Sequence, residues 1–550
     1  MGLQRRFRPR PRRQHILQSA TGVRQGDPLG PLLLSLAIRP LLDRLSTFLG
    51  TDHLVLAYLD DVYVLSPTSD LASAQELTST LEKIYSFFDS SPSSLKLNRA
   101  KCIEKTLSDI KEHGCNILGS CVGSPQSQAA FLASKIDKLV DQVQNLALLP
   151  HQHALLLLRQ CIQQDLRHLQ RSLPDHPSIN AQWTRLDRAL WNEVMRLRGR
   201  VNQPQGDRQE LDDAILSLPL RLGGLGVLSH LSVAPHALAA SNEPADRHID
   251  AFMNIQFSQQ DIPPAAVKSE HERCQATWET TQTSLIGTLD DTERKLLAEA
   301  ASPLGWKWLN TIPFYQPLYL TDFEVSTALN YRTLACSPLT TCSWCSRPNS
   351  LGHDELCMTR PRQTVARHDS LARIIHSTLK TIDPTAEHEP HSFEGRRRND
   401  IRLRGPFRGT IDYDIKVYTL LAANATKTTT RAPENVSLPA HITQQSLKYL
   451  DGVGRHATHV RPLTNGRFIP LVFSAGGLMA KDTASELEVW RKEMGHTKFN
   501  RMITRLSMAL LKARSRSFDM VRSGRQEGTL EELNGEFDAA ADLGGEFDAV

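Results

Sequence analysis

The sequence contains no long uninterrupted apolar run, and none approaches the roughly 18 residues that a membrane-spanning helix needs. The start of the chain also lacks the charged-then-apolar pattern of a secretory signal, so we expect neither a membrane protein nor a secreted one. Cysteine is sparse, with nine in 550 residues, which excludes a disulfide scaffold. The odd number favours reduced thiols or a metal site. Hydrophobic residues (40%) and charged residues (23%) are balanced as in globular proteins, and the length allows about three or four domains.

Acidic residues are missing from one end of the chain, and basic residues are missing from the other. Residues 1–26 contain seven arginines and no acid, whereas residues 526–550 contain eight acids and no base. Residues 491–525 contain ten basic residues against two acids. Separated basic blocks indicate an anionic polymer as partner, although a single block is often only a solvated surface.

The first informative segment is residues 21–45, TGVRQGDPLGPLLLSLAIRPLLDRL. Asp27 followed by Pro28 is typical of a helix start, and the apolar run that follows predicts a buried helix. The glycines before it form a turn that can approach a ligand closely. Taken alone, the segment is only a capped core helix.

The second segment is residues 53–66, HLVLAYLDDVYVLS. Two apolar β-rich runs flank Asp60 and Asp61, which predicts a hairpin with a carboxylate pair at its tip. Two acids at the end of buried strands are costly unless a cation neutralises them. Mg²⁺ would do so, and two such ions can assist a phosphoryl displacement. The alternative is a water-exposed Asp-Asp turn.

Taken together, four blocks in order resemble the palm of reverse transcriptases, specifically those of non-LTR (LINE-like) retrotransposons. The blocks are QGDPLGP at 25–31, YLDD at 58–61, LKLNRAKC at 95–102 and ILGS at 117–120. The last resembles the primer-grip turn. The resemblance covers about residues 20 to 125 and implies an RNA-directed DNA polymerase ancestry.

The same resemblance implies roles for individual residues. Asp60 and Asp61 would be catalytic and would bind Mg²⁺ (or Mn²⁺). Contacts to template, primer or dNTP would come from Gln25, Gly26, Tyr58 and Lys101.

One departure from the family pattern bears on activity. The first catalytic aspartate of the family lies on a strand well before the QGDPLGP block, and the fingers lie before that. Residues 1–24 are arginine-rich and contain no acid. We therefore expect an N-terminally truncated family member that cannot polymerise as the chain stands. An upstream aspartate-bearing strand in transcripts would reverse this expectation.

Residues 129–200 are predicted to be helical, because apolar residues such as Leu132, Ile136, Leu139 and Val140 recur at helical spacing. In the family this region is the thumb, which grips the template–primer duplex. Residues 221–226, RLGGLG, resemble a block that follows the thumb. They fit neither phosphate-binding fingerprint, so we predict a structural turn.

A candidate zinc site follows, formed by Cys342, Cys345, His353 and Cys357 in the spacing C-x2-C-x7-H-x3-C. Two thiolates two residues apart can share one ion, and the histidine and last cysteine lie one helical turn apart. Four protein ligands imply a structural Zn²⁺, not a catalytic one. The alternatives are an incidental or redox CxxC pair, or four buried residues in a small core.

Arg367-His368-Asp369 comes after the cysteines, an order that resembles the restriction-like endonuclease region of non-LTR elements. Residues 411–417, IDYDIKV, alternate apolar and polar side chains, so Asp412, Asp414 and Lys416 share one face of a strand.

Asp400 joins that face from the preceding strand. Two carboxylates can hold Mg²⁺ while a lysine orients or deprotonates the attacking water. The resemblance places Asp400, Asp414 and Lys416 in the catalytic D…D-x-K positions, with Glu389 as a candidate helix carboxylate. Asn399 stands where a proline is usual. The alternative is an amphipathic surface strand.

We therefore predict a multidomain α/β (α+β) chain: a basic N-terminal segment (1–20), a partial reverse-transcriptase palm (21–125), a helical thumb (126–235), a connector (236–330), a zinc-binding segment (331–380), a restriction-like endonuclease domain (385–520) and an acidic disordered tail (521–550). The parent activity would be target-primed reverse transcription with an RNA template and a DNA target and primer. The arginine-rich ends fit a nuclear location, and the oligomeric state stays open.

Three hypotheses compete. The first is a polymerase, and the second is a DNA endonuclease that survives without the polymerase. The third is a non-catalytic nucleic-acid-binding relic, or a chain that does not fold stably because half its palm is missing. The polymerase is opposed by the missing carboxylate. The endonuclease requires Asp400, Asp414 and Lys416 to converge on one metal ion. A relic would expose apolar palm strands.

Overall fold

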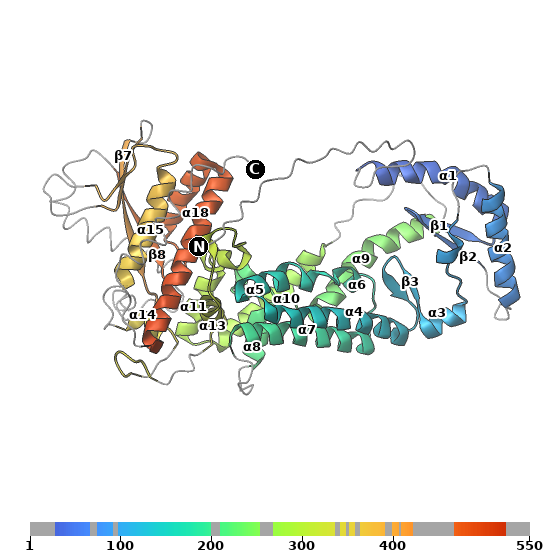
Figure 1. The fold of residues 1–550 in the computed structure, drawn as a ribbon, viewed down its shortest axis with the longest axis horizontal. Coiled ribbons are helices and arrows are strands. Elements are labelled where there is room, and N and C mark those ends of the chain that lie inside the picture. Colours follow the sequence, from blue (N-terminus) through green and yellow to red (C-terminus); the bar gives the residue numbers. More distant parts are fainter. Residues whose placement is uncertain are drawn as a thin grey trace, which may run out of the picture. The chain divides into compact units, whose positions relative to one another are not determined.

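The computed structural model describes residues 28–66, 74–91, 97–199, 209–253, 268–335, 341–347, 351–357, 363–390, 399–405, 409–421 and 467–523. The chain divides into two compact units, which we describe separately (Figure 1). The N-terminal unit spans Met1–Cys115 and Val122–Ser124, and the C-terminal unit spans Asn116–Cys121 and Pro125–Val550. Within the described ranges, no helix is both long and apolar enough to cross a membrane.

The N-terminal unit contains helices around one β-hairpin. Its elements are α1 (Gly30–Leu49), β1 (Leu54–Tyr58), β2 (Asp61–Leu65), α2 (Ala74–Ser90), the 3₁₀ turn η1 (Arg99–Lys101) and α3 (Leu107–His113). The strands β1 and β2 pair antiparallel, with Tyr58 opposite Asp61, as the sequence predicts. Phe48 of α1 contacts Phe87 of α2, with ring centroids 5.3 Å apart.

Helix α1 is present, but its predicted burial is wrong. Leu32, Leu33 and Leu36 are each about half exposed (56%, 49% and 56%), whereas the buried residues are Gly30, Leu41 and Leu45. The strands of the hairpin are exposed as well. The physical reason is that the described strands here form a two-stranded sheet, which is too narrow to cover a 20-residue helix.

The start of α1 also differs from the expectation. The helix begins at Gly30 and carries Pro31 in its first turn. Pro28 lies in the preceding turn, and Asp27 lies outside the described residues. Proline still marks the helix start, because its fixed φ suits the first turn.

The ILGS block forms a tight turn between β3 (Cys115–Ile117) and β4 (Ser120–Val122). Leu118 and Gly119 both have positive φ, 49° and 78°. Two successive left-handed residues match the two-residue turn whose twist suits an antiparallel hairpin.

The C-terminal unit begins with a helical region, which confirms the helical prediction for residues 129–199; residue 200 lies outside the described residues. Its helices are α4 (Pro125–Asn145), α5 (His151–Gln160), α6 (Arg167–Gln170), α7 (Pro177–Leu197), α8 (Gln209–Ser217), α9 (His230–Met253), α10 (Glu270–Thr288), α11 (Asp291–Ala301), α12 (Pro303–Lys307) and α13 (Asp322–Arg332). Three helix starts are fixed by reciprocal capping boxes, in the pairs Ser269–Glu272, Asp290–Glu293 and Thr321–Glu324.

One apolar core joins this helical region to distant parts of the chain. Leu132, Ile136 and Leu139 of α4 are buried, as expected, and Val140 packs against them partly exposed. The same core contains Trp308, Leu309, Leu318, Leu320, Val325 and Leu329 from the segment predicted as a connector, and Met508 and Leu511 from the last helix. The boundaries between the finer domains stay predictions.

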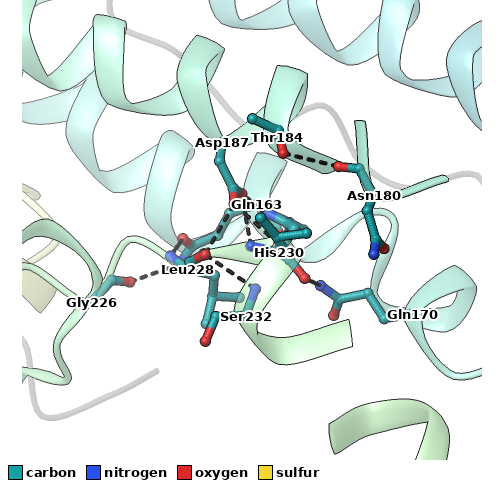
Figure 2. Close-up of polar contacts among 11 residues, drawn as sticks. Gln163, Gln170, Asn180, Thr184, Asp187, Gly226, Leu228, His230 and Ser232 are labelled. Carbon is teal, nitrogen blue, oxygen red and sulfur yellow. Dashed lines mark hydrogen bonds and ion pairs between the residues drawn. The ribbon is translucent and has the colours of Figure 1, made fainter. Parts of the chain in front are cut away.

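A buried aspartate fastens α7 to the start of α9 (Figure 2). The Asp187 carboxylate accepts hydrogen bonds from the backbone N–H groups of His230 (2.7 Å) and Leu231 (3.2 Å). The His230 ring bonds Asp187 through Nδ1 (2.9 Å) and the Gln163 carbonyl oxygen through Nε2 (3.1 Å). Both partner atoms are hydrogen-bond acceptors, so the His230 ring is held from two sides. Asp187 therefore acts as a helix cap supplied from another helix.

The RLGGLG block is a structural turn, as predicted. A side chain at Gly224 would place its Cβ 2.0 Å from the Leu218 carbonyl oxygen, so only glycine fits there. The buried Arg332 donates to the carbonyl oxygens of Gly224 (2.6 Å) and Ala300 (2.8 Å). Burial lowers the pKa of Arg332 to about 9, because a guanidinium without water loses hydration energy.

The C-terminal region contains a four-stranded sheet with two helices packed on it (Figure 1). The strands are β5 (Glu387–His388), β6 (Ile401–Gly405), β7 (Gly409–Tyr418) and β8 (Arg467–Ser474), in that order. Strands β6 and β7 pair antiparallel, and β7 and β8 pair parallel. Helix α15 (Gln363–Leu379) and helix α18 (Lys481–Ser523) share a core with the sheet. Helix α18 is broken at Gly495, where φ is 77°.

Candidate functional sites

The tip of the β1–β2 hairpin presents Asp60 and Asp61. Both side chains are exposed, and Tyr58, opposite Asp61, is 59% exposed. Leu59 has a φ of 55°, a left-handed conformation that costs a non-glycine residue of the order of 1 kcal/mol or more. Such strain at a turn next to two carboxylates is typical of a functional site.

Lys101 lies on η1, which is tied to α2 rather than to the hairpin. The Arg99 side chain forms an ion pair with Asp89, and its guanidinium lies 4.6 Å from the centre of the Tyr85 ring. Within the described residues, no hydrogen bond or ion pair joins Lys101 to either hairpin aspartate. Gln25 and Gly26 lie outside the described residues.

The four predicted zinc ligands come together in one cluster. The ligand atoms of Cys342, Cys345, His353 and Cys357 all lie within 4.8 Å of one another. The Sγ atoms of Cys342 and Cys357 are 3.8 Å apart, and Cys345 Sγ lies 3.2 Å from His353 Nε2. Sulfurs about 2.3 Å from a tetrahedral zinc ion would lie about 3.8 Å from each other, so the donor set fits such an ion.

Local geometry holds these ligands in place. A tight turn links the first two cysteines, with the Ser346 N–H donating to the Cys342 carbonyl (2.9 Å) and a φ of 55° at Ser346. His353 begins the short helix α14 (His353–Leu356), and the Cys357 N–H closes its last turn on the His353 carbonyl (2.9 Å). The i and i+4 positions therefore place both side chains on one side of the helix.

Buried charges fasten α14 to the rest of the unit. Arg514 of α18 binds Glu355 (2.5 Å) and Glu299 (2.6 Å), and Glu299 also accepts from the Gly476 N–H (3.0 Å). The Tyr331 hydroxyl donates to Asp354. Burial raises the pKa of Glu355, and the Arg514 charge opposes that effect.

Asp400 and Asp414 lie next to each other across the β6–β7 pair. Ile401 pairs with Tyr413 in the antiparallel register, so the preceding Asp400 faces the following Asp414. The Asp400 N–H donates to the Tyr413 carbonyl (3.1 Å), and its carboxylate accepts from the Ile415 N–H. Lys416 follows two residues along the same strand face with an exposed side chain.

The helix α15 supplies His368 to this pair. Its Nε2 lies 3.0 Å from Asp400 Oδ2, and its Nδ1 lies 3.0 Å from Asp369 Oδ1. The hydrogen bond to Asp400 raises the pKa of His368 to about 9. Burial and the negative charge of Asp400 raise the pKa of Asp414 to about 7, against the opposing charges of His368 and Lys416.

Asp412 shares the strand face but is already neutralised. Arg402, directly opposite it, donates through Nε (2.6 Å) and Nη2 (3.0 Å). The Asn399 amide donates to the same carboxylate (2.9 Å). Because Arg402 and Asn399 occupy both oxygens of Asp412, the candidate ligands for a cation on this face are Asp400 and Asp414.

Residues 6–122 match the family model for reverse transcriptase (RNA-dependent DNA polymerase). This part of the chain is related to reverse transcriptases. The matched segment contains the YLDD hairpin and ends just after the ILGS turn. No curated protein matches the chain.

The reverse-transcriptase-related segment implies binding of a nucleic-acid template and primer, and domains of this family generally use Mg²⁺. The roles of Asp60, Asp61, Tyr58 and Lys101 stay predictions, as do those of the residues in the C-terminal sheet.

Two features of the C-terminal site differ from the sequence expectation. Glu389 does not lie on a helix: it follows β5 with a φ of 47°, and its N–H donates to the Asp400 carbonyl (2.8 Å). The helix residue that reaches Asp400 is His368, which the sequence singled out only as part of an RHD-like motif. The motif was therefore a usable signal, but local sequence patterns do not determine how α15 packs against β6, and the His368–Asp400 contact depends on that packing.

Proposed function

We propose that this chain is a retrotransposon protein of the non-LTR type in which a reverse-transcriptase-related segment is joined to a metal-dependent DNA endonuclease. The observation that carries the proposal is the cross-strand pair Asp400 and Asp414, with His368 and Lys416 beside it. Two carboxylates side by side, one of which (Asp414) has a raised pKa, are costly unless a cation binds them, and such pairs are frequent in catalytic sites.

Asp400 and Asp414 would hold Mg²⁺ (or Mn²⁺), which supplies charge stabilisation at a phosphate oxygen and lowers the pKa of a bound water. His368 keeps the Asp400 carboxylate oriented through its 3.0 Å hydrogen bond. Lys416 would orient the attacking water or the phosphate. The reaction class is hydrolysis of a DNA phosphodiester on one strand.

The hairpin aspartates support a polymerase ancestry. Asp60 and Asp61 supply two of the three carboxylates that the family uses, so we propose that this chain as it stands does not extend primers. In the parent activity, target-primed reverse transcription, a nick provides the 3′ end and an RNA provides the template. The cysteine cluster would hold a structural Zn²⁺.

The test is a nicking assay on supercoiled plasmid with Mg²⁺ or Mn²⁺, with a primer-extension lane from the same preparation. The full chain is compared with Asp414→Ala and with Asp383→Ala, an aspartate of the same region that binds its own loop at Thr385. We expect nicking by the wild type and by Asp383→Ala, none by Asp414→Ala, and no extension by any.

A second candidate is a non-catalytic nucleic-acid-binding relic. It is favoured by the exposed apolar side chains of α1 and of the hairpin. If the wild type and Asp414→Ala nick plasmid equally, or neither nicks it, with or without metal, the nuclease proposal is wrong and the relic remains as the explanation. Primer extension by the wild type would contradict the inactive polymerase.

A further inference from the structure

A loop of the C-terminal unit presents large apolar side chains to water. Residues 311–320 run across the helical core, where Trp308, Leu309, Leu318 and Leu320 are buried. Ile312 and Phe314 point away and are 70% and 73% exposed. Because buried neighbours anchor the loop on both sides, these two side chains are held at the surface by the fold.

Aromatic and basic side chains gather around this loop. The rings of Phe314 and Tyr315 lie 4.9 Å apart at 50°, and the Arg501 guanidinium lies 5.7 Å from the Tyr315 ring centre. Lys307 Nζ lies 3.5 Å from the Asn500 side-chain oxygen of α18. We call the following set the arginine–aromatic patch: Lys307, Ile312, Phe314, Tyr315, Arg501 and Arg505.

The positive charge of the patch is not balanced within the described residues. Arg501 and Arg505 lie one turn apart on α18, where like charges repel each other. No carboxylate in the described part of the chain forms an ion pair with either. Burial and the Arg501 charge lower the pKa of Arg505. By contrast, Arg491 on the same helix pairs with Glu488 (2.6 Å).

We propose that the arginine–aromatic patch binds single-stranded DNA, with a base stacked on Phe314 and backbone phosphates beside Arg501 and Arg505. Exposed rings interleaved with unpaired cations are the features with which proteins hold single strands. A protein partner would also cover the exposed ring, and a wild type that binds no oligonucleotide would favour that partner. The assignment to DNA rests on the proposed function, because a nick made in the same unit leaves a DNA strand end that can separate from its complement and then be held as a single strand.

The test is fluorescence anisotropy of the full chain with a labelled oligothymidine of about 16 nucleotides, in buffer without added divalent ions. Duplex DNA and oligouridine of the same length are measured beside it. The variants are Phe314→Ala, Phe314→Trp and Arg501→Gln. Two matched controls are Arg491→Gln, the paired arginine of α18, and Val365→Ala, an exposed apolar residue of α15.

We expect Phe314→Ala to raise the Kd for oligothymidine at least about fivefold, and Phe314→Trp to bind like the wild type. Arg501→Gln should lower the slope of log affinity against log salt by about 0.7. The controls should bind like the wild type, and all variants should keep the wild-type melting temperature.

The proposed role of the arginine–aromatic patch would be overturned if Phe314→Ala and the controls bound oligothymidine equally well. It would also be overturned if the wild type bound no single-stranded oligonucleotide. Tighter binding to oligouridine with the same Phe314 dependence would overturn the assignment to DNA. Plasmid nicking separates the two proposals. If the wild type nicks plasmid but the patch variants bind oligothymidine as the wild type does, the nuclease proposal stands and the patch proposal is wrong. If binding depends on Phe314 but no nicking is seen, the patch proposal stands and the nuclease proposal is wrong.

Discussion

At the scale of single residues, the buried Asp187 and the half-buried Asp414 of the C-terminal unit have opposite surroundings. Asp187 receives backbone and ring N–H donors at both oxygens, so its charge is stabilised inside the fold. Asp414 lies beside a second carboxylate, and its pKa is raised to about 7. A buried charge with all its hydrogen bonds satisfied supports the fold, whereas a carboxylate beside a second carboxylate is a candidate cation ligand.

The Asp414 site predicts a pH dependence of stability. Because its pKa is raised, Asp414 in the folded chain keeps a proton that the unfolded chain releases near pH 4. This difference in proton binding makes the free energy of unfolding larger at low pH, and that stability is lost as the pH rises through about 7. We expect the metal-free wild type to lose more stability between about pH 5 and 8 than Asp414→Asn does. Thermal melting across this pH range measures it.

Mg²⁺ provides the control for that experiment. The ion should raise the melting temperature of the wild type at about pH 8 and leave Asp414→Asn unchanged, because binding to the folded state alone stabilises it. Parallel pH profiles of the two proteins would contradict the raised pKa.

The Asp187 cap predicts a large loss of stability when its side chain is shortened to alanine. Asp187→Ala leaves the buried His230 ring and two backbone N–H groups without their acceptor, and we expect a cost of about 3–5 kcal/mol in the free energy of unfolding. Asp137→Ala is the matched control, because Asp137 is exposed and its ion pair in the described part of the chain is with Arg185. Its cost should stay below about 1 kcal/mol. Urea unfolding compares them, and similar costs would refute the capping role.

At the scale of elements, α14 shows how a short helix is stabilised from outside. A helix of four residues has no stability of its own. His353 and Cys357 join it to the cysteine turn, while Glu355 and Asp354 join it to α18 and α13. We therefore expect that removing a zinc ion bound by the cysteine cluster would loosen the partners of the buried Arg514.

The cysteine cluster predicts one zinc ion per chain. Cys345→Ser should lower the zinc content by elemental analysis and the melting temperature by about 5 °C or more. Cys161→Ser, a change at an exposed cysteine outside the cluster, should alter neither. A zinc-free wild type that melts like the zinc-loaded protein would contradict a structural ion.

At the scale of the whole molecule, the two units differ in how well they are packed. The clusters of buried apolar side chains come from residues 129 and beyond, and α18 contributes to both of the largest. In the N-terminal unit, α1 and the hairpin expose apolar side chains such as Leu36 and Leu56. Exposed apolar strands and helix faces are hazards for aggregation.

This difference predicts that residues 116–523 fold without the N-terminal unit. We expect that fragment to melt within about 2 °C of the main transition of the full chain, because the shared core of α18 is intact. The full chain should bind more of a hydrophobic dye than the fragment does. An insoluble fragment, or one that melts much lower, would show that the N-terminal unit stabilises the rest.

Several features of this protein are determined by the sequence alone. The helical spacing of Leu132 and Ile136, the hairpin around Asp60, the alternation through Asp414 and the spacing of the cysteines all appear in the structure as predicted. Each depends on backbone geometry and side-chain period over a few residues, which a sequence displays directly.

Other features were decided only by the tertiary structure. The packing of α15 brings His368 to Asp400, and α18 brings Arg501 to Tyr315. The exposure of Leu32 and Leu36 was also not predictable from the sequence. Apolar spacing predicts which face of a helix should be buried, but not whether another element packs against that face. These contacts join elements far apart in the chain, so they depend on how sheets and helices pack and not on any local pattern.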